Sequence, residues 1–349
     1  MVHESSHESV VSSAVSSNKL DIPLIDFSAF LSKDTALRQS TATAILDGFR
    51  RAGFIYLRNH GITPPEVQHA FAQSAAFFRL PKAEKDALAW TTARANRGYS
   101  AQGKDKTTDL TDPEAIAALR EFEGEDLKET MEIGRENEPG CPNLWPTAGP
   151  DGKPAEFKKD MIDFFARCKT LHMEVMRAIA VGLGIEQSWF DSYCDGGDNT
   201  LRLLHYPAVP AAVFRENRNQ VRAGAHTDYG SITLLFQDQR GGLQVLSPDG
   251  HTFVDATPIP DTIVVNAGDL LARWSNDVIK STKHRVVEPP NADPHAEVHP
   301  ARYSIAYFCN PNFDRFIDAI PGTYQSADDK KYSGVNSGDY LVQRLEATY

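Results

Sequence analysis

Residues 224–246 read GAHTDYGSITLLFQDQRGGLQVL. Short apolar runs separated by glycine-containing turns predict three strands within this stretch, at 224–228, 231–236 and 243–246. Five further runs of the same kind lie on either side of it, at 200–206, 252–255, 262–266, 284–287 and 302–308. Asp249-Gly250 adds a strong hairpin signal. Eight short strands at this spacing predict a jelly roll made of two sheets.

The upstream sequence changes to helical spacing. Helices are predicted at 35–51, at 64–80 and, as the longest one, at 156–182. We therefore expect a mainly β fold with flanking helices. Its expected parts are a flexible tail at 1–18, a helical N-terminal region with some strands at 19–150, a long support helix at 151–190, the jelly-roll core at 191–325 and a C-terminal helix at 326–349.

Composition limits the function classes. The chain has 349 residues, 41% hydrophobic and 24% charged, with 36 Lys and Arg against 47 Asp and Glu, a net charge of −11. Such an acidic chain disfavours nucleic acid and anionic membranes as partners. The 4 cysteines form no CxxC pair, and the first residues do not resemble a secretory signal. We expect reduced thiols, a cytoplasmic location and a small-molecule substrate. The sequence gives no indication of the oligomeric state.

One residue pattern in the predicted core suggests a metal site. Side chains two apart on a strand share a face, so His226 and Asp228 would point the same way. A chance H-x-D is common in a chain with 11 His and 47 acidic residues, so this pattern is weak alone. His284, on another predicted strand, is the best placed third ligand. Two histidines and one carboxylate are the facial ligand set of non-haem iron sites.

A second pattern strengthens the first one. Strand alternation places Arg302 and Ser304 on the same inward face, and it groups Arg202 with Tyr206 on the neighbouring predicted strand. A buried arginine needs an anion, and arginine beside a hydroxyl makes a good carboxylate receptor. The alternative is a surface arginine on an edge strand. Tyr206 would give this carboxylate a third hydrogen bond.

Together these motifs resemble the iron(II)/2-oxoglutarate-dependent dioxygenases of the isopenicillin N synthase-like family. The resemblance extends from about Ile22 to near the C-terminus. It depends on the order and spacing of IPLIDFSAF (22–30), GFRRAGFIYLRNHGI (48–62), FFRLPKAEK (77–85), AHTDYGSITLLFQD (225–238), VVNAGDLLARWSNDVIKSTKHRV (264–286) and RYSIAYFCNPNFD (302–314).

The resemblance implies a double-stranded β-helix (cupin-like) core and specific residue roles. His226, Asp228 and His284 match the iron ligands, and Arg302, Ser304 and Tyr206 match the residues that hold 2-oxoglutarate. The implied reaction couples oxidative decarboxylation of 2-oxoglutarate by O2 to hydroxylation, desaturation or cyclisation of a small molecule, with ascorbate as a supporting reductant. Secondary-metabolite tailoring is the expected substrate class.

Two positions depart from the family pattern. Leu204 stands where many plant members have an asparagine that helps to bind the cosubstrate. The segment between His284 and Arg302 is longer than usual, so residues 288–300 are expected to form a solvent loop in a hairpin.

Five residues are candidates for the substrate pocket. Phe308 matches a substrate-contacting position in relatives, with core packing as the alternative. Arg202 matches a basic position that touches substrate or cosubstrate in several relatives. Tyr229 follows the metal aspartate and would orient its carboxylate. Thr130 and Glu132 alternate on a strand that covers the pocket mouth in relatives, and the alternative for Glu132 is a salt bridge to a surface lysine. Gln102–Asp112 and Gly124–Asp126 are expected to form a lid.

Three alternative functions stay open. The first is an iron oxidase of the same fold that does not consume 2-oxoglutarate, since such oxidases keep a similar Arg-x-Ser pair. The second is a zinc hydrolase that uses the same three ligands, which leaves an inward Arg302 and Ser304 unexplained. The third is a non-enzymatic jelly-roll binding protein, which would be expected to lose a ligand or the arginine.

Overall fold

The computed structural model describes residues 9–104, 106–110, 112–289 and 295–346. All eight strands expected for the jelly roll are present in it, and they divide equally between two sheets. Four of them form the middle of a nine-stranded sheet, whose order is β1 (Val11–Ser17), β2 (Leu20–Asp26), β3 (Phe54–Arg58), β12 (Thr262–Ala267), β9 (Ile232–Gln237), β15 (Arg302–Cys309), β6 (Thr200–Tyr206), β5 (Glu129–Gly134) and β4 (Gly98–Ser100). The jelly-roll prediction is confirmed.

The other four strands form the second sheet, in the order β11 (Phe253–Asp255), β10 (Leu243–Leu246), β13 (His284–Val286) and β8 (Ala223–His226). Apolar side chains of both sheets share one buried cluster, which includes Tyr206 and Ala306 from the large sheet and Ala223 and Val245 from the small one. The two sheets therefore pack face to face, as they must to bury both inner faces.

Strand alternation separates the inner face of the large sheet from its outer face. On β15, Ile305 and Tyr307 belong to the apolar cluster shared with the helices, while Arg302 and Ser304 line a cavity between the sheets. β6 pairs with β15 so that Tyr206 lies opposite Arg302. This register places the candidate cosubstrate residues side by side on the inner face.

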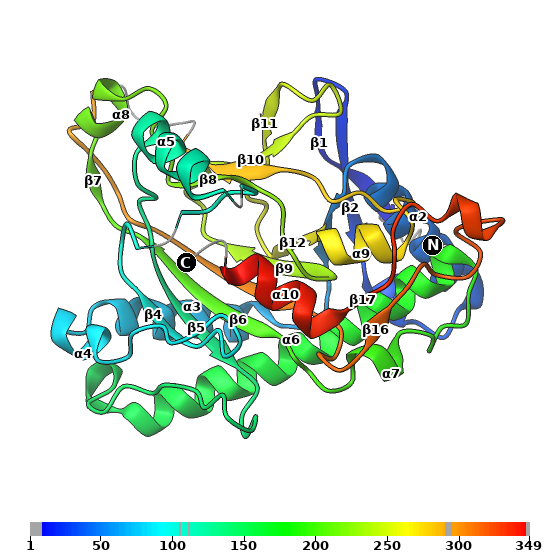
Figure 1. The fold of residues 1–349 in the computed structure, drawn as a ribbon, viewed down its shortest axis with the longest axis horizontal. Helices are drawn as coiled ribbons and strands as arrows, with labels where there is room; N and C mark the ends of the chain where they lie inside the picture. Colours follow the sequence, from blue (N-terminus) through cyan, green and yellow to red (C-terminus); the bar gives the residue numbers. More distant parts are fainter. Residues whose placement is uncertain (1–8, 105, 111, 290–294, 347–349) are drawn as a thin grey trace, which may run out of the picture.

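Helices cover the outer face of the large sheet (Figure 1). The longest, α6 (Pro154–Leu183), begins with proline at its first position and ends at Gly184, whose φ of +74° is the left-handed conformation that glycine adopts readily. Its apolar stripe is buried and consists of Phe164, Phe165, Leu171, Val175 and Ile179. The other helices are α1 (Ser28–Leu31), α2 (Thr35–Arg51), α3 (Pro64–Phe78), α4 (Lys82–Asp86), α5 (Pro113–Glu123), α7 (Asp191–Cys194), α8 (Ala212–Glu216), α9 (Asp269–Trp274) and α10 (Ser337–Glu346).

Two helix boundaries follow local signals in the sequence. The Asp34 side chain accepts hydrogen bonds from the backbone N–H groups of Ala36 and Leu37 and caps α2. The Asp112 side chain likewise accepts a hydrogen bond from the backbone N–H of Ala115 and caps α5, and proline follows it. Among the described residues, no helix has both the length and the apolar character needed to cross a bilayer. The four cysteines are buried free thiols.

Three expectations about the chain's segments are wrong. Residues 11–17 are not a flexible tail but the edge strand β1, because alternation buries Val15 while β2 supplies backbone hydrogen bonds; residues 1–8 lie outside the described residues. The segment 288–300 is not only a solvent loop, because β14 (Val298–His299) pairs with β7 (Val209–Pro210) and buries His299; residues 290–294 lie outside the described residues. Residues 326–349 are not one helix, because the short strand β17 (Val335–Asn336), paired with β16 (Phe316–Ile317), precedes α10.

Candidate active site

The two candidate histidine ligands are direct neighbours across the small sheet. His226 ends β8, His284 begins β13, and the strand register pairs them. Their ring centroids are 4.3 Å apart, and each Nε2 atom lies 3.7 Å from Oδ1 of Asp228. The three ligand atoms lie within 4.8 Å of one another. Antiparallel pairing therefore brings residues 58 positions apart to one point.

Both imidazoles are oriented by backbone carbonyls. Nδ1 of His226 lies 2.8 Å from the carbonyl oxygen of Gly224, and Nδ1 of His284 lies 3.2 Å from that of Thr282. When each Nδ1–H donates to its carbonyl, Nε2 keeps its lone pair and faces Asp228. Burial, followed by the neighbouring His284, lowers the pKa of His226 to about 4, so this imidazole is neutral at neutral pH.

The Asp228 carboxylate is held from the large sheet. Its Oδ2 atom accepts hydrogen bonds from the Thr233 hydroxyl at 2.5 Å and from the Asn266 amide at 2.7 Å. Burial alone would raise the pKa of Asp228, but the two imidazoles and these hydrogen bonds lower it overall. Oδ1 is thus the oxygen left to face the histidines.

These donors fit a divalent transition metal. Two imidazole nitrogens and one carboxylate oxygen, arranged around one point, form the facial triad of non-haem iron enzymes. The ligands of such sites normally make hydrogen bonds of this kind through the atoms that do not face the metal, here as donors at Nδ1–H and as an acceptor at Oδ2. The residues present therefore fit iron.

A cavity of about 560 Å³ extends from the triad between the two sheets. His226, Asp228 and His284 line one part of it, and Arg302 and Ser304 line another. The Arg302 side chain is buried, its Nη1 lies 3.2 Å from the Ser304 hydroxyl, and its guanidinium carbon lies 4.8 Å from the Tyr206 ring centroid. This arrangement suits a small diacid, with one carboxylate at the arginine and the other end at the metal.

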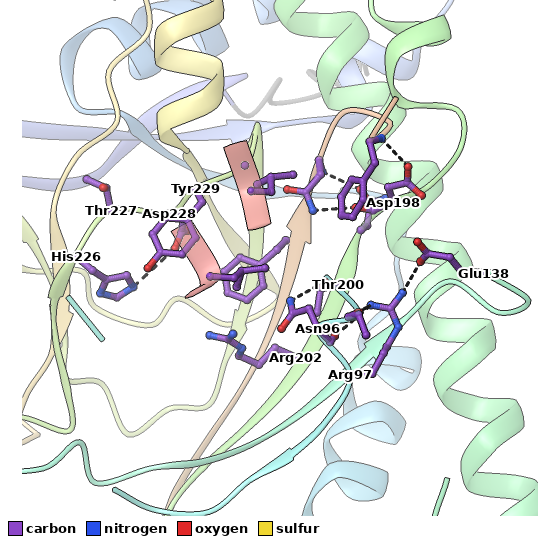
Figure 2. A pocket seen from close by; sticks show the side chains of 18 of the residues that line it. Asn96, Arg97, Glu138, Asp198, Thr200, Arg202, His226, Thr227, Asp228 and Tyr229 are labelled. Atoms are coloured by element: carbon purple, nitrogen blue, oxygen red, sulfur yellow. Dashed lines mark hydrogen bonds and ion pairs between the residues drawn. The ribbon is translucent and has the colours of Figure 1, made fainter. Parts of the chain in front are cut away.

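A second cavity, of about 820 Å³, meets the first at the metal site. Figure 2 shows His226, Asp228 and Tyr229 on one side of this cavity and Arg202 on the other. His226, Asp228, Arg202 and Phe308 line both cavities. A molecule in the second cavity would therefore meet the same metal as a diacid in the first.

The comparisons with known proteins agree with this geometry. Family models match the chain at residues 197–311 ("2OG-Fe(II) oxygenase superfamily") and 22–148 ("non-haem dioxygenase in morphine synthesis N-terminal"). The 2-oxoglutarate-Fe(II) type oxidoreductase ppzD of Metarhizium rileyi is 32% identical over 329 residues, 93% of this chain and 90% of that protein. The chain belongs to the iron(II)/2-oxoglutarate-dependent dioxygenases.

Solved structures extend the comparison. T7H of Neurospora crassa, in complex with alpha-KG (2-oxoglutarate) and thymine, is 62% identical, with a TM-score of 0.89 over 97% of this chain and 100% of that one. Its complex with alpha-KG and 5-formyluracil is 59% identical, with a TM-score of 0.87 over 97% and 99%.

This dioxygenase uses Fe(II), 2-oxoglutarate and O2, and it couples oxidative decarboxylation of 2-oxoglutarate to C–H oxidation of a small molecule. His226, Asp228 and His284 would hold the iron, which supplies the oxygen-activating chemistry when bound. Arg302, Ser304 and Tyr206 come together as the sequence predicted. Family membership removes the zinc-hydrolase and binding-protein alternatives.

The candidate substrate residues fall into two groups in the dioxygenase. Arg202, Phe308 and Tyr229 line the second cavity, whereas Thr130 and Glu132 are not among its lining residues. Glu132 is fully buried and pairs with Arg202 at 2.6 Å, not with a surface lysine. Strand register explains this ion pair, since β5 pairs with β6 so that Glu132 and Arg202 lie opposite each other. Thr130 lies opposite Leu204 in the same way.

The lid prediction is wrong for Asp126 and stays a prediction for the other residues. Asp126 is fully buried and accepts hydrogen bonds from Lys106 and Lys128, so it belongs to the interior rather than to a mobile cover. Asp109, within the predicted lid segment, contacts the site through its carboxylate, which accepts hydrogen bonds from the backbone N–H of Thr227 at 2.6 Å and from its hydroxyl at 3.1 Å.

Sequence reasoning missed the role of the C-terminal helix. Leu341 and Leu345 of α10 line the second cavity. On the same helix, Arg344 lies over the Tyr229 ring, 4.5 Å from its centroid, and pairs with Asp269 at 3.2 Å. Asp269 in turn accepts a hydrogen bond from Thr227, between two metal ligands. The helix is thus tied to the residues beside the metal site.

We predict that Thr233→Val weakens Fe(II) binding by about 10- to 100-fold, because it removes one of the two hydrogen bonds that orient Asp228. Thr233→Ser is the matched control, since it keeps the hydroxyl. The measurement is an anaerobic Fe(II) titration against a competing chelator. Equal affinities of the valine and serine variants would contradict the orienting role.

Proposed function

We propose that the dioxygenase oxidises the C5 methyl group of thymine, and further oxidises the product at the same carbon. The similarity to T7H carries this proposal, because it covers nearly the whole chain and the T7H structures contain thymine or 5-formyluracil. These two bases differ only in the oxidation state of the C5 substituent. A series of oxidations at the C5 substituent would connect thymine with 5-formyluracil.

The chemistry of the second cavity supports a flat, neutral heterocycle. Phe308 and Tyr229 present aromatic rings, which stack on planar bases. The Arg202 guanidinium lies 4.8 Å from the Phe308 ring centroid, and Glu132 fixes it from behind. Guanidinium N–H groups are suitable donors for the carbonyl oxygens of a pyrimidine.

The cavity favours a free base over a nucleic acid. Leu341 and Leu345 of α10 form part of its wall, and Leu341 is buried. The net charge of −11 disfavours a phosphate backbone as well. The substrate class expected from the sequence, a secondary metabolite, stays a prediction, because no side chain of the cavity favours it over a pyrimidine base.

Each oxidation of the base consumes one O2 and one 2-oxoglutarate. In the first turnover, one atom of O2 enters the methyl C–H bond to give the alcohol, and the other enters 2-oxoglutarate, which loses its 1-carboxyl group as CO2 and becomes succinate. In the second turnover, the same insertion at the alcohol carbon gives a hydrate that loses water to form the aldehyde, with a second O2 and a second 2-oxoglutarate consumed. The two substrates together supply the four electrons that reduce O2. The protein's own residues hold both molecules at the metal and keep the base oriented.

The test is an assay of the iron-loaded protein with 2-oxoglutarate, ascorbate and oxygen. We expect thymine to stimulate succinate formation and to yield 5-hydroxymethyluracil and 5-formyluracil, detected by mass spectrometry. Uracil, which lacks the methyl group, and thymidine, which carries a sugar, are the matched controls. Succinate formation that is the same with thymine and uracil, without oxidised thymine, would refute the proposal.

Arg202→Lys should raise the KM for thymine by about 10- to 100-fold, because an ammonium keeps the charge but loses the planar fork of donors. The KM for 2-oxoglutarate should change by less than about twofold. Lysine is chosen so that Glu132 keeps a cationic partner. An unchanged KM for thymine would show that Arg202 does not contact the base.

Arg344→Met should raise the KM for thymine by about 3- to 10-fold, since it removes the contact with Tyr229 and the ion pair with Asp269. Steady-state kinetics at saturating 2-oxoglutarate measures this. Equal increases in the KM values of thymine and 2-oxoglutarate would indicate general loosening instead of a role in holding α10 over the base.

A further inference from the structure

A second buried arginine, Arg222, lies beside the arginine end of the 2-oxoglutarate cavity. It directly precedes β8, and its backbone N–H donates to the carbonyl oxygen of Val286 at 2.8 Å. The next residue, Ala223, lines the cavity. The Arg222 side chain extends toward the start of β15, where its Nη2 lies 3.4 Å from the carbonyl oxygen of Pro300.

The Arg222 guanidinium lacks the partners that a buried charge normally has. The residue is 0% exposed, and Nε and Nη1 have no hydrogen-bond partner among the described residues. Within the same described part of the chain, no carboxylate forms an ion pair with Arg222 or with Arg302. An uncompensated buried cation is costly, so this position needs an explanation.

The charges around Arg222 make its position more unusual. Burial and then the positive charge of Arg302 lower the pKa of Arg222 to about 10, while Tyr206, Asp238 and Glu288 act in the opposite direction. Among the described residues, the hydrogen-bond acceptors of Arg302 are all neutral: the Gly241 carbonyl, the Ser304 hydroxyl and the Gln237 amide. Two guanidinium groups thus influence each other at the same end of the cavity.

We propose that Arg222 is a second cation for the distal carboxylate of 2-oxoglutarate, a positioning residue that acts from behind Arg302 and Tyr206. Without the diacid, the two arginines repel each other. When the distal carboxylate arrives at Arg302, its negative charge adds to the neighbourhood of both cations and offsets this repulsion. Arg222 thereby increases the preference of the cavity for a diacid over a monoacid. This inference concerns the cosubstrate and does not depend on thymine being the substrate.

The test compares two ligands that differ only in the distal carboxylate. 2-Oxopentanoate has the metal-binding end and chain length of 2-oxoglutarate but ends in a methyl group. Calorimetry with the iron-loaded protein, without oxygen, gives the Kd of each ligand, and their ratio measures the selectivity for the diacid. Arg222→Met removes the charge at similar volume, and Arg222→Lys keeps the charge.

We expect Arg222→Met to reduce this selectivity ratio about tenfold, mainly through weaker 2-oxoglutarate binding, and Arg222→Lys to stay near the wild-type ratio. Arg285→Met is the matched control. It removes a positive charge from the same small sheet, but Arg285 pairs with Gln244 and packs on Phe253, away from the cavity lining. Its ratio should not change.

A second readout separates positioning from a structural role. Replacing an uncompensated buried cation by methionine should leave the free energy of unfolding of the ligand-free protein unchanged or higher. A selectivity ratio that is unchanged in Arg222→Met, or that Arg222→Lys does not restore, would overturn the proposal. If the unfolding free energy falls while the ratio stays at the wild-type value, Arg222 has only a structural role.

Discussion

The site depends on the pairing of β8 with β13. This pairing makes His226 and His284 direct neighbours, and it leaves Asp228 just beyond the strand end, where the other sheet can hold its carboxylate. The metal site is therefore a contact between the two sheets and not a property of one loop. A one-residue slip in this register would turn His284 to the opposite face, and the ligand set would be lost.

The same two-sheet arrangement separates the two molecules that must meet. The large sheet places Arg302 and Arg202 on its inner face, two rows apart, because Tyr206 pairs with Arg302 and Ala306 pairs with Arg202. Arg302 lines only the first cavity, whereas Arg202 lines both. The fold thus provides one cavity between the sheets at Arg302 and another under α10, with the metal ligands lining both.

Period-two alternation made much of this predictable. It correctly grouped Arg302 with Ser304 and Arg202 with Tyr206, since one face of each strand must point inward in a two-sheet fold. It did not reveal that Thr233 and Asn266 hold Asp228, because those contacts depend on how two strands distant in sequence pack against the metal aspartate. A single hydroxyl or amide on a buried strand gives no signal by itself.

The errors have a common physical origin. Glu132 was predicted at the substrate pocket, with a surface lysine as the alternative partner, but strand register supplied Arg202 from another part of the chain. The supposed tail at 11–17 is ordered by pairing with β2, and Val298–His299 is ordered by pairing with β7, both through backbone hydrogen bonds that composition does not encode. Pairing with another strand, not the propensity of the segment itself, decided each case.

The most direct test of the account is an anaerobic titration of the metal-free protein with Fe(II) and 2-oxoglutarate. Absorption of 2-oxoglutarate chelated to iron gives the stoichiometry of the complex. The account predicts one iron and one 2-oxoglutarate per chain for the wild type, and no such complex for His284→Ala. A His284→Ala variant that forms the complex with wild-type stoichiometry and affinity would contradict the assignment of the metal site.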